Sequence, residues 1–394
     1  MADLQTFAQS YIDAFSRGYN WAFAVAAGAM VLSTAVYILF NKFLPNKEKH
    51  SAKETVPQKP TALIFALIAA AAFGGLIYLF SENIDISFAV GLFIGFVAWI
   101  VQISTKAELP RVVALLLVFL VVIFFWMSFH QNGLTLTFFA RDYTVQKVGP
   151  FTNIFFHLDS MLAFIGAAAG FFLLVLNKQK SVKAIGVVML IGFGAITYHM
   201  VTTAQALNPI DPEVFQSFNP LFIVALTFPI MGLFAWLNRR NLEPSTPKKI
   251  GIGMIIAAFG FLLVLIASLK LVSPFMLQYV DEFGKQAVKA VPDSSRVSPY
   301  WLINSYLILT IAELFLSPMG LSFVSKVAPS RFQGVMQGGW LLATAVGNKL
   351  LFVGSYFWGK LELWQLWAIF VACCLLSALF IFSIMKRLEE ATKS

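Results

Sequence analysis

The chain has 394 residues, of which 59% are hydrophobic and 12% are charged, and its formal net charge is +9. About a quarter of the residues in a soluble domain are charged, so this chain lacks the polar surface to cover its apolar share, which excludes a soluble globular protein. The basic residues lie in short loops between apolar runs rather than with aromatic residues on one face, which excludes nucleic acid as a partner.

Apolar runs long enough to cross a bilayer recur along the whole chain. A helix needs roughly 20 apolar residues to span a hydrocarbon core of about 30 Å. We find eleven such windows, at 20–41, 61–80, 86–104, 111–130, 151–176, 183–204, 218–237, 250–271, 300–322, 333–357 and 364–385. We therefore expect an all-α, polytopic membrane protein with about eleven transmembrane helices.

The loops that carry lysine and arginine set the expected orientation, because basic loops stay in the cytoplasm. Nineteen of these residues lie in one set of alternate loops, and eight lie in the other set together with the N-terminal segment 1–19. This bias predicts a multi-pass protein of the plasma membrane, here a bacterial inner membrane, with a cytoplasmic C-terminus and an external N-terminal segment. An odd number of spans with an external start leads us to expect that helices are missing upstream, through truncation or a split gene.

Composition divides the chain into a linker, two hairpins and a bundle. Residues 42–60 are polar, Lys-rich and interrupted by prolines, which is typical of a solvated cytoplasmic linker. The spans within 61–104 have no charge inside the membrane and are expected to form a lipid-facing hairpin. The spans within 151–204 form a second expected hairpin, inserted into a C-terminal bundle that extends over 105–388.

One acidic residue lies near the middle of a span. Glu313 is about twelve residues from the outer end of its helix, where a carboxylate costs several kcal/mol unless it is protonated, paired or facing a water-filled cavity. This position predicts a functional acid, and the alternative is a structural acid that is either held neutral or paired with Lys349. Ser317 follows by four residues on the same helical face, although serines in such helices also bond to their own backbone. Lys349 is otherwise expected to extend to the outer interface.

Four further positions combine polar or aromatic side chains with helix ends or close packing. Trp126 and Gln131 lie at the outer end of the span at 111–130, where an aromatic belt accounts for the ring but not for the amide-rich turn. Asn219 precedes a proline and either contributes to a site or caps its helix. Trp340 lies in a stretch of small residues four apart, which favours close helix packing, and is either a site residue or a buried core aromatic.

Three stretches resemble, in order, the seventh, eighth, tenth and eleventh helices of the proton-dependent oligopeptide transporters of the major facilitator superfamily. They are FFWMSFHQNGLTLTFFA, QSFNPLFI and YLILTIAELFLSPMGLSFVSKVAPSRFQGVMQGGWLLATAVGN. In that family a two-helix hairpin divides two six-helix bundles, which 61–104 resembles, and the span at 20–41 resembles the sixth helix. The resemblance covers most of residues 18–388.

The resemblance implies residue roles. Glu313 and Asn219 match residues that hold the amino end of the peptide, and Ser317 and Trp340 match residues of the pocket. Lys349 is the one candidate in the spans for the peptide carboxylate. The candidate substrate-binding residues are therefore Glu313, Asn219, Ser317, Trp340, Gln131 and Trp126.

The implied function is the C-terminal part of a proton-coupled di- or tripeptide symporter, which is not an enzyme and is not competent for transport alone. Its partners are the peptide, protons as the coupling ion, the lipid bilayer, and either a missing N-terminal bundle or a second copy of the chain; no other cofactor is expected.

The chain departs from the family pattern in two places. The family has a loop where this chain has the hairpin at 151–204, and the first five helices, with their Glu-x-x-Glu-Arg motif, do not precede these spans.

Two alternatives remain. His157 and His199 lie at similar depths in neighbouring expected spans and could ligate haem or a metal, which would indicate a membrane redox or enzyme subunit. The chain could also be a non-functional truncated fragment.

Cys373 and Cys374 are neighbours in an apolar run, where they form neither a usual disulfide nor a four-ligand metal site.

Overall fold

The computed structural model describes residues 2–40, 59–280, 282, 284 and 286–393. It is nearly all helical, and ten helices within these residues are long and apolar enough to cross a membrane. The predicted class, a polytopic all-α membrane protein, is thereby confirmed. The Lys-rich linker predicted at 42–60 lies outside the described residues, apart from its last two positions.

The N-terminal unit is a single helix, α1 (Ala2–Phe40). The segment at 1–19, predicted to lie outside the membrane before the first span, continues the same helix, whose membrane-length part is Ser16–Phe40. Its external location stays a prediction. Contacts one turn apart support the continuation. Gln9 Nε2 donates to Asp13 Oδ1 (3.0 Å), and Arg17 Nε donates to the backbone oxygen of Asp13 (3.3 Å).

The second unit begins with a hairpin of two antiparallel helices, α2 (Pro60–Ser81) and α3 (Ile84–Ile103). Glycine allows the two backbones to approach closely, since a Cβ on Gly91 would lie 2.7 Å from the backbone oxygen of Ala70. The other faces of both helices carry exposed apolar side chains, such as Leu79 and Phe88. The hairpin therefore has one packed face and one face suited to lipid.

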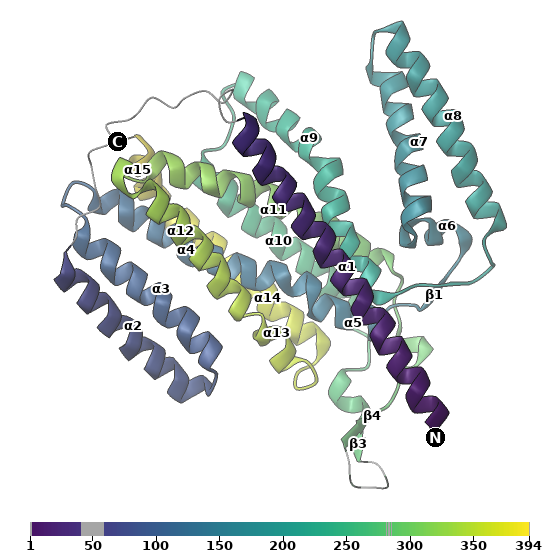
Figure 1. The fold of residues 1–394 in the computed structure, drawn as a ribbon, viewed down its shortest axis with the longest axis horizontal. Coiled ribbons are helices and arrows are strands. Elements are labelled where there is room, and N and C mark those ends of the chain that lie inside the picture. The colour runs from purple at the N-terminus through teal and green to yellow at the C-terminus, as the bar shows by residue number, and fades with distance from the viewer. Residues whose placement is uncertain (1, 41–58, 281, 283, 285, 394) are drawn as a thin grey trace. The chain divides into compact units, whose positions relative to one another are not determined.

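A second hairpin, α7 (Leu158–Leu176) and α8 (Lys180–Thr203), stands to one side of the other helices of this unit (Figure 1). Its helices also meet at glycines, because a Cβ on Gly186 would lie 2.8 Å from the backbone oxygen of Gly170. The span predicted from residue 151 starts later than expected. Residues 150–156 form instead two short turns, α6 (Pro150–Asn153) and η3 (Ile154–Phe156), at the foot of the hairpin.

The bundle contains the core of the second unit. Its buried side chains are large and aromatic, and they include Phe119, Phe125, Phe261, Tyr306, Phe323, Trp367 and Phe370. The helices are α4 (Leu109–Phe129), α5 (Thr135–Tyr143), α9 (Phe218–Arg239), α10 (Thr246–Ser268), α11 (Tyr300–Val327), α12 (Gln333–Lys349), α13 (Phe352–Phe357), α14 (Leu363–Ser383) and α15 (Met385–Lys393).

The tenth predicted span, at 333–357, is not one helix but is divided into α12 and α13. The count of membrane-length helices is therefore ten within the described residues, not eleven. A polar side chain lies at the break. The buried amide of Gln131 donates to the backbone oxygen of Leu351 (3.1 Å) and also to that of Met127 (3.1 Å), at the break that ends α4. One side chain thus supplies the hydrogen bonds that two interrupted helices lack.

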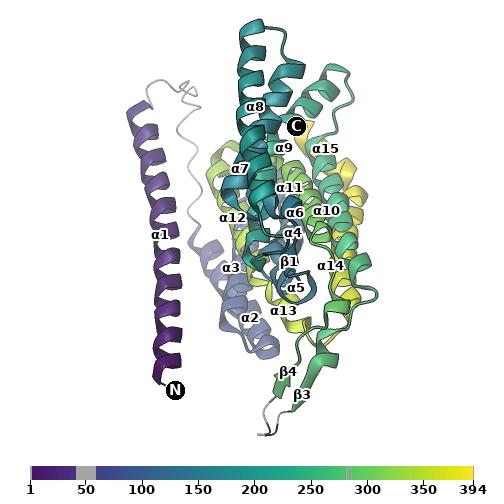
Figure 2. The same cartoon turned by 90° about the vertical axis from the view of Figure 1, so that its right-hand side faces the viewer.

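Turns and two short strand pairs lie in the connections between the helices. The turns are η2 (His130–Gly133), η4 (Pro212–Ser217), η5 (Pro274–Leu277), η6 (Asp293–Ser295) and η7 (Ser330–Phe332). Strands β1 (Lys147–Val148) and β2 (Asn208–Pro209) form one antiparallel pair, and β3 (Gln278–Val280) and β4 (Gln286–Val288) form another. Both views place β3 and β4 at one end of the bundle and α15 toward the other (Figures 1 and 2).

An ion pair at the α15 end joins the start of α4 to the turn before α12. Arg331 Nε donates to Glu108 Oε1 (2.8 Å) and Nη2 donates to Glu108 Oε2 (2.5 Å), while the backbone and hydroxyl of Thr105 donate to the same carboxylate (2.8 Å each). Burial raises the pKa of Glu108, but these hydrogen bonds outweigh it, so the pKa lies below its ordinary value of 4.5. The pair fixes the α11–α12 turn.

This ion pair predicts a loss of stability in acid. Because the pKa of Glu108 is lower in the folded state, its stabilisation is complete above pH 4.5 and disappears as the pH falls through the folded-state value. We expect Glu108→Gln to lower the free energy of unfolding by about 1 kcal/mol at pH 7 and to flatten the decline of Tm between pH 5 and pH 3, measured in detergent. Glu390→Gln, at an exposed position of α15, is the control. Parallel Tm curves for Glu108→Gln and the unmodified protein would refute the assignment.

Candidate functional site

The proposed site lies where the start of α9 meets the middle of α11. The two helices pack through Phe234 and Phe315, whose rings contact edge to face at 4.9 Å between centroids. Asn219, in the first turn of α9, lies beside Glu313, at the midpoint of α11. Both side chains are half-buried.

The amide of Asn219 connects the two helices. Its Nδ2 donates to Glu313 Oε2 (2.9 Å) and to Thr310 Oγ1 (3.1 Å), and the Thr310 hydroxyl donates to the backbone oxygen of Tyr306 (2.8 Å). A carboxylate only accepts hydrogen bonds, so the NH₂ group of Asn219 must face it. Within the described residues the Oδ1 of Asn219 has no hydrogen-bond donor and is left available to a ligand.

The helix cap predicted as the alternative for Asn219 and the pairing with Lys349 predicted as one alternative for Glu313 are wrong. Asn219 does not cap its helix, because the amide side chain reaches across to α11 and the residue at the cap position is Ser217. Glu313 is not paired with Lys349, whose Nζ lies 3.3 Å from Asp85 Oδ2 at the start of α3. The described residues give the Glu313 carboxylate no cationic partner.

Ser317 lies one turn after Glu313, half-buried and directly before the helix-interrupting Pro318. Its hydroxyl makes no hydrogen bond to any described residue, so it does not bond to its own backbone in this structure. The position of Ser317 on the Glu313 face follows from helical spacing. Its contact with a peptide stays a prediction.

Trp340 lies inside the bundle rather than beside Asn219. Its ring is 3% exposed, contacts Phe119 edge to face at 6.3 Å, and covers Gly320, two turns after Glu313 on α11. The structure thus agrees with a buried core aromatic, the alternative left open by the sequence. In this conformation the ring packs against α11 at Gly320.

Gln131 was wrongly predicted to contact substrate. It is fully buried, its NH₂ group donates to two backbone oxygens, and its Oε1 accepts from the Thr135 hydroxyl (2.8 Å). Both N–H donors of this amide are taken and the side chain is out of reach of a ligand.

Trp126 is also in the core, 8% exposed, where its ring stacks on His130 at 4.7 Å. His130 Nδ1 in turn forms a hydrogen bond with Asn348 Oδ1 of α12. The structure therefore places Trp126 at the contact of α4 with α12.

Thr310 was missed by the sequence reasoning. It lies three residues before Glu313, on the same helical face, and its hydroxyl fixes the orientation of the Asn219 amide. Helical spacing alone could have identified it as a neighbour of Glu313. Its contact with Asn219 depends on how α9 packs against α11, which spacing does not show.

The two histidines of the redox alternative occupy different surroundings. His157 precedes α7 and lines a cavity with Asp159, Asn153 and Asn208 at the foot of the hairpin, whereas His199 is an exposed residue of α8 outside that lining. The described residues contain no group of three or more His, Cys, Asp or Glu side chains that could hold a metal ion.

A bundle of membrane-length helices with a half-buried acid and amide in its middle defines a multi-pass membrane protein with a polar intramembrane site. A profile of the PTR2 family, described as the POT family, matches residues 4–155 and 179–357, and the chain belongs to this family. Its members are transporters, not enzymes. The predicted family is thereby confirmed.

Relatives show how much of the chain this similarity covers. The peptide transporter YePEPT of Yersinia enterocolitica is 37% identical over 136 residues, 34% of this chain and 23% of that protein. The dipeptide and tripeptide permease A of Chromobacterium violaceum is 25% identical over 338 residues, 84% of this chain and 52% of that protein. The chain thus spans about half the length, or less, of the curated relatives it matches.

Solved structures agree on the fold. A POT family transporter crystallised in complex with 5-aminolevulinic acid superposes with a TM-score of 0.55 at 20% identity, over 93% of this chain and 62% of that one. The POT family transporter PepTSo superposes with a TM-score of 0.53 at 17% identity, over 94% of this chain and 65% of that one.

Proposed function

We propose that this chain forms part of a proton-coupled di- or tripeptide symporter and holds the amino end of the peptide between Glu313 and Asn219. The observation that carries the proposal is the hydrogen bond from Asn219 Nδ2 to Glu313 Oε2, which joins the first turn of α9 to the middle of α11, two membrane-length helices. The names of the relatives, which include peptide transporters and dipeptide and tripeptide permeases, give the substrate class.

The chemistry of the pair suits an ammonium group. Glu313 supplies a negative charge, and Asn219 supplies a neutral acceptor at Oδ1, because Thr310 and Glu313 take both contacts of its NH₂ group. An ammonium has three donors and no acceptor, so these oxygens meet its needs in a poorly solvated cavity. The free hydroxyl of Ser317 lies one turn further along the same face.

The peptide carboxylate is met, in this proposal, by groups outside the C-terminal bundle. An unpaired carboxylate is prohibitive in a cavity of low dielectric, and Lys349, the candidate from the sequence, is occupied by Asp85. The missing groups belong to an N-terminal bundle or to a second copy of the chain. The side of α9 that carries Phe228, 79% exposed, is one surface open to such a neighbour.

Proton coupling places a further demand on the site. A carboxylate that both binds the ammonium and carries the proton would have its two tasks in competition, so in this proposal the coupling groups also lie outside the bundle. Alternating access then requires a second bundle against which this one moves. The proposed location is the bacterial inner membrane, with the C-terminus in the cytoplasm, as the lysine and arginine bias indicates.

A binding experiment on the purified chain tests whether the site holds a peptide ammonium, with a ligand that lacks a carboxylate. Alanyl-alanine amide has an ammonium but no carboxylate, and it is expected to bind at least about tenfold more tightly than its N-acetylated form, because the loss of a charge-assisted contact costs on the order of 1.5 to 3 kcal/mol. Equilibrium dialysis of radiolabelled ligands measures both affinities. Equal binding of the two amides would refute the proposed site.

A second experiment compares the contribution of Asn219 to binding with that of Thr310, which orients the Asn219 amide. Asn219→Ala removes a neutral acceptor and is expected to weaken binding of alanyl-alanine amide by roughly 1 to 2 kcal/mol. Thr310→Val keeps the shape of the side chain but frees the Asn219 amide, and should cost about half as much. If the two changes together cost the sum of their separate effects, Thr310 does not act through Asn219, because coupled residues are not additive.

A further inference from the structure

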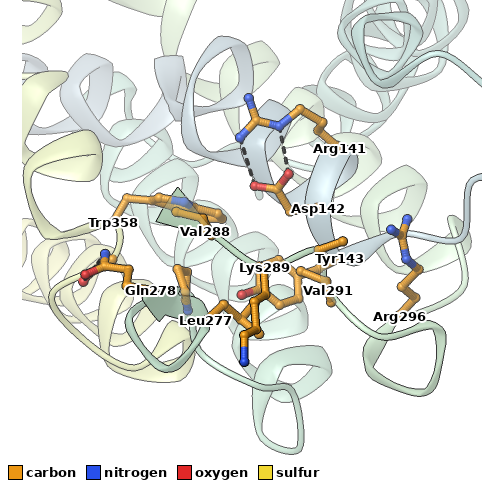
Figure 3. Close-up of a pocket in the computed structure, with 13 residues that line it drawn as sticks. Arg141, Asp142, Tyr143, Leu277, Gln278, Val288, Lys289, Val291, Arg296 and Trp358 are labelled. Carbon is orange, nitrogen blue, oxygen red and sulfur yellow. Dashed lines mark hydrogen bonds and ion pairs between the residues drawn. The ribbon is translucent and has the colours of Figure 1, made fainter. Parts of the chain in front are cut away.

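A cavity of about 470 Å³ lies at the β3–β4 end of the bundle, far from Glu313. Three parts of the chain enclose it: the end of α5, the connection from α10 to α11, and the turn between α13 and α14 (Figure 3). Tyr300 begins α11 thirteen residues before Glu313, which is about 20 Å of helix. The cavity is therefore separate from the proposed peptide site.

Backbone hydrogen bonds hold the walls of this cavity together. The Val297 nitrogen donates to the Tyr143 oxygen (2.8 Å), which joins α5 to the segment before α11. The Lys289 nitrogen donates to the Leu277 oxygen (2.8 Å), beside the β3–β4 pair. Gln278 Nε2 donates to the Gly359 oxygen (3.4 Å) across to the third wall. The cavity is thus formed in advance by the fold.

Two buried donors in the wall have no hydrogen-bond acceptor among the described residues. The Tyr143 hydroxyl is one, although the residue is only 1% exposed. The other is Arg296 Nε, which forms an ion pair with Asp293 Oδ1 at 3.4 Å but no hydrogen bond, while Nη1 donates to the Thr144 oxygen (3.2 Å). A buried donor without an acceptor costs about 1 to 3 kcal/mol, so an acceptor from outside the chain would stabilise this wall.

The remaining lining adds positive charge and an apolar surface. Arg141 is paired with Asp142 (2.7 Å), and Lys289 lies at the rim with its ammonium 5.6 Å from the Tyr279 ring, so three cations accompany one acid in the lining. The Trp358 ring contacts the Tyr143 ring edge to face at 6.2 Å. The apolar lining residues are Pro274, Leu277, Val288, Ala290 and Val291.

We propose that this cavity is a binding site for a small organic carboxylate that carries an apolar group. The carboxylate oxygens accept from the guanidinium of Arg296 and the hydroxyl of Tyr143, which supplies the two missing acceptors in one ligand. The apolar group lies against Trp358 and the neighbouring aliphatic side chains. Lys289 adds long-range attraction at the entrance.

The test uses N-acetyl-L-phenylalanine, which has a carboxylate and an apolar ring but no ammonium for Glu313. Equilibrium dialysis with the purified chain should show saturable binding of this acid, and the matched N-acetyl-phenylalanine amide should bind at least about tenfold more weakly. Arg296→Gln should weaken binding of the acid about tenfold or more, and Tyr143→Phe, which removes only the hydroxyl, about three- to tenfold.

Two control variants separate this site from general charge and from the peptide site. Lys270→Gln removes a cation from an exposed position at the same end of the bundle, outside the cavity lining, and should leave binding of the acid unchanged. Glu313→Gln should also leave it unchanged, so the carboxylate site can hold even if the proposed peptide site fails. The proposal is overturned if acid and amide bind equally, or if Tyr143→Phe with an unaltered Tm binds the acid as well as the unmodified protein does.

Discussion

Replacing Glu313 with glutamine is expected to abolish uptake of dipeptides that have a free amino end. The change keeps the size of the side chain and an oxygen facing Asn219, but it removes the charge that pairs with the peptide ammonium. Loss of one partner from a desolvated, hydrogen-bonded charge pair costs about 2 to 5 kcal/mol. Initial rates of dialanine uptake, measured with the protein in its native membrane, should therefore fall to background.

Glu390→Gln provides the matched control, since it makes the same chemical change at an exposed position of α15. It should leave uptake unchanged. A Glu313→Gln variant that is present in the membrane at the usual amount and takes up dialanine at the usual rate would show that Glu313 is a structural acid.

Much of the architecture follows from apolar length, because a bilayer requires long helices with internal hydrogen bonds. What length does not reveal is where a polar side chain interrupts a helix. Gln131 illustrates the limit. The sequence shows an amide-rich turn there, but only the packing of α4 against the α12–α13 break shows that the amide is consumed by two backbone oxygens.

The candidate site was also predictable from the sequence only in part. An acid at the middle of a span identifies Glu313 on energetic grounds, and family resemblance identifies Asn219. Neither argument distinguishes a residue that faces a ligand from one that faces a neighbouring helix. Trp340, which resemblance also assigned to the pocket, is turned into the core, whereas Thr310, which no motif marked, holds the Asn219 amide.

The spacing of small residues in α12 does not show which face of the helix packs against a neighbour. Gly334 and Gly338 are four apart, as are Gly339, Ala343 and Gly347, and both series predict close packing. A Cβ on Gly347 would lie 2.6 Å from the backbone oxygen of Ile123, whereas one on Gly334 or Gly338 would meet no atom within 4 Å. Only the second series is at a helix contact.

The contact between α11 and α12 predicts a strong effect of one added methyl group. A Cβ on Gly320 would lie 1.9 Å from Cη2 and 2.3 Å from Cζ2 of Trp340, and this ring is 3% exposed and packed against Phe119, so it has no room to withdraw. We expect Gly320→Ala to destabilise the protein by about 1 to 3 kcal/mol. Because Gly320 lies two turns from Glu313, the displaced helix should also weaken binding of alanyl-alanine amide.

Gly338→Ala makes the same change where the added Cβ meets nothing within 4 Å, and since alanine favours helix by up to about 1 kcal/mol over glycine, it should be neutral or stabilising. Thermal unfolding in detergent compares the two variants. A smaller ring should relieve the strain, so Trp340→Leu should cost less in the Gly320→Ala background than it does alone, which is the non-additivity expected of residues in contact. A Tm for Gly320→Ala equal to that of Gly338→Ala would show that α11 and α12 do not meet through this ring.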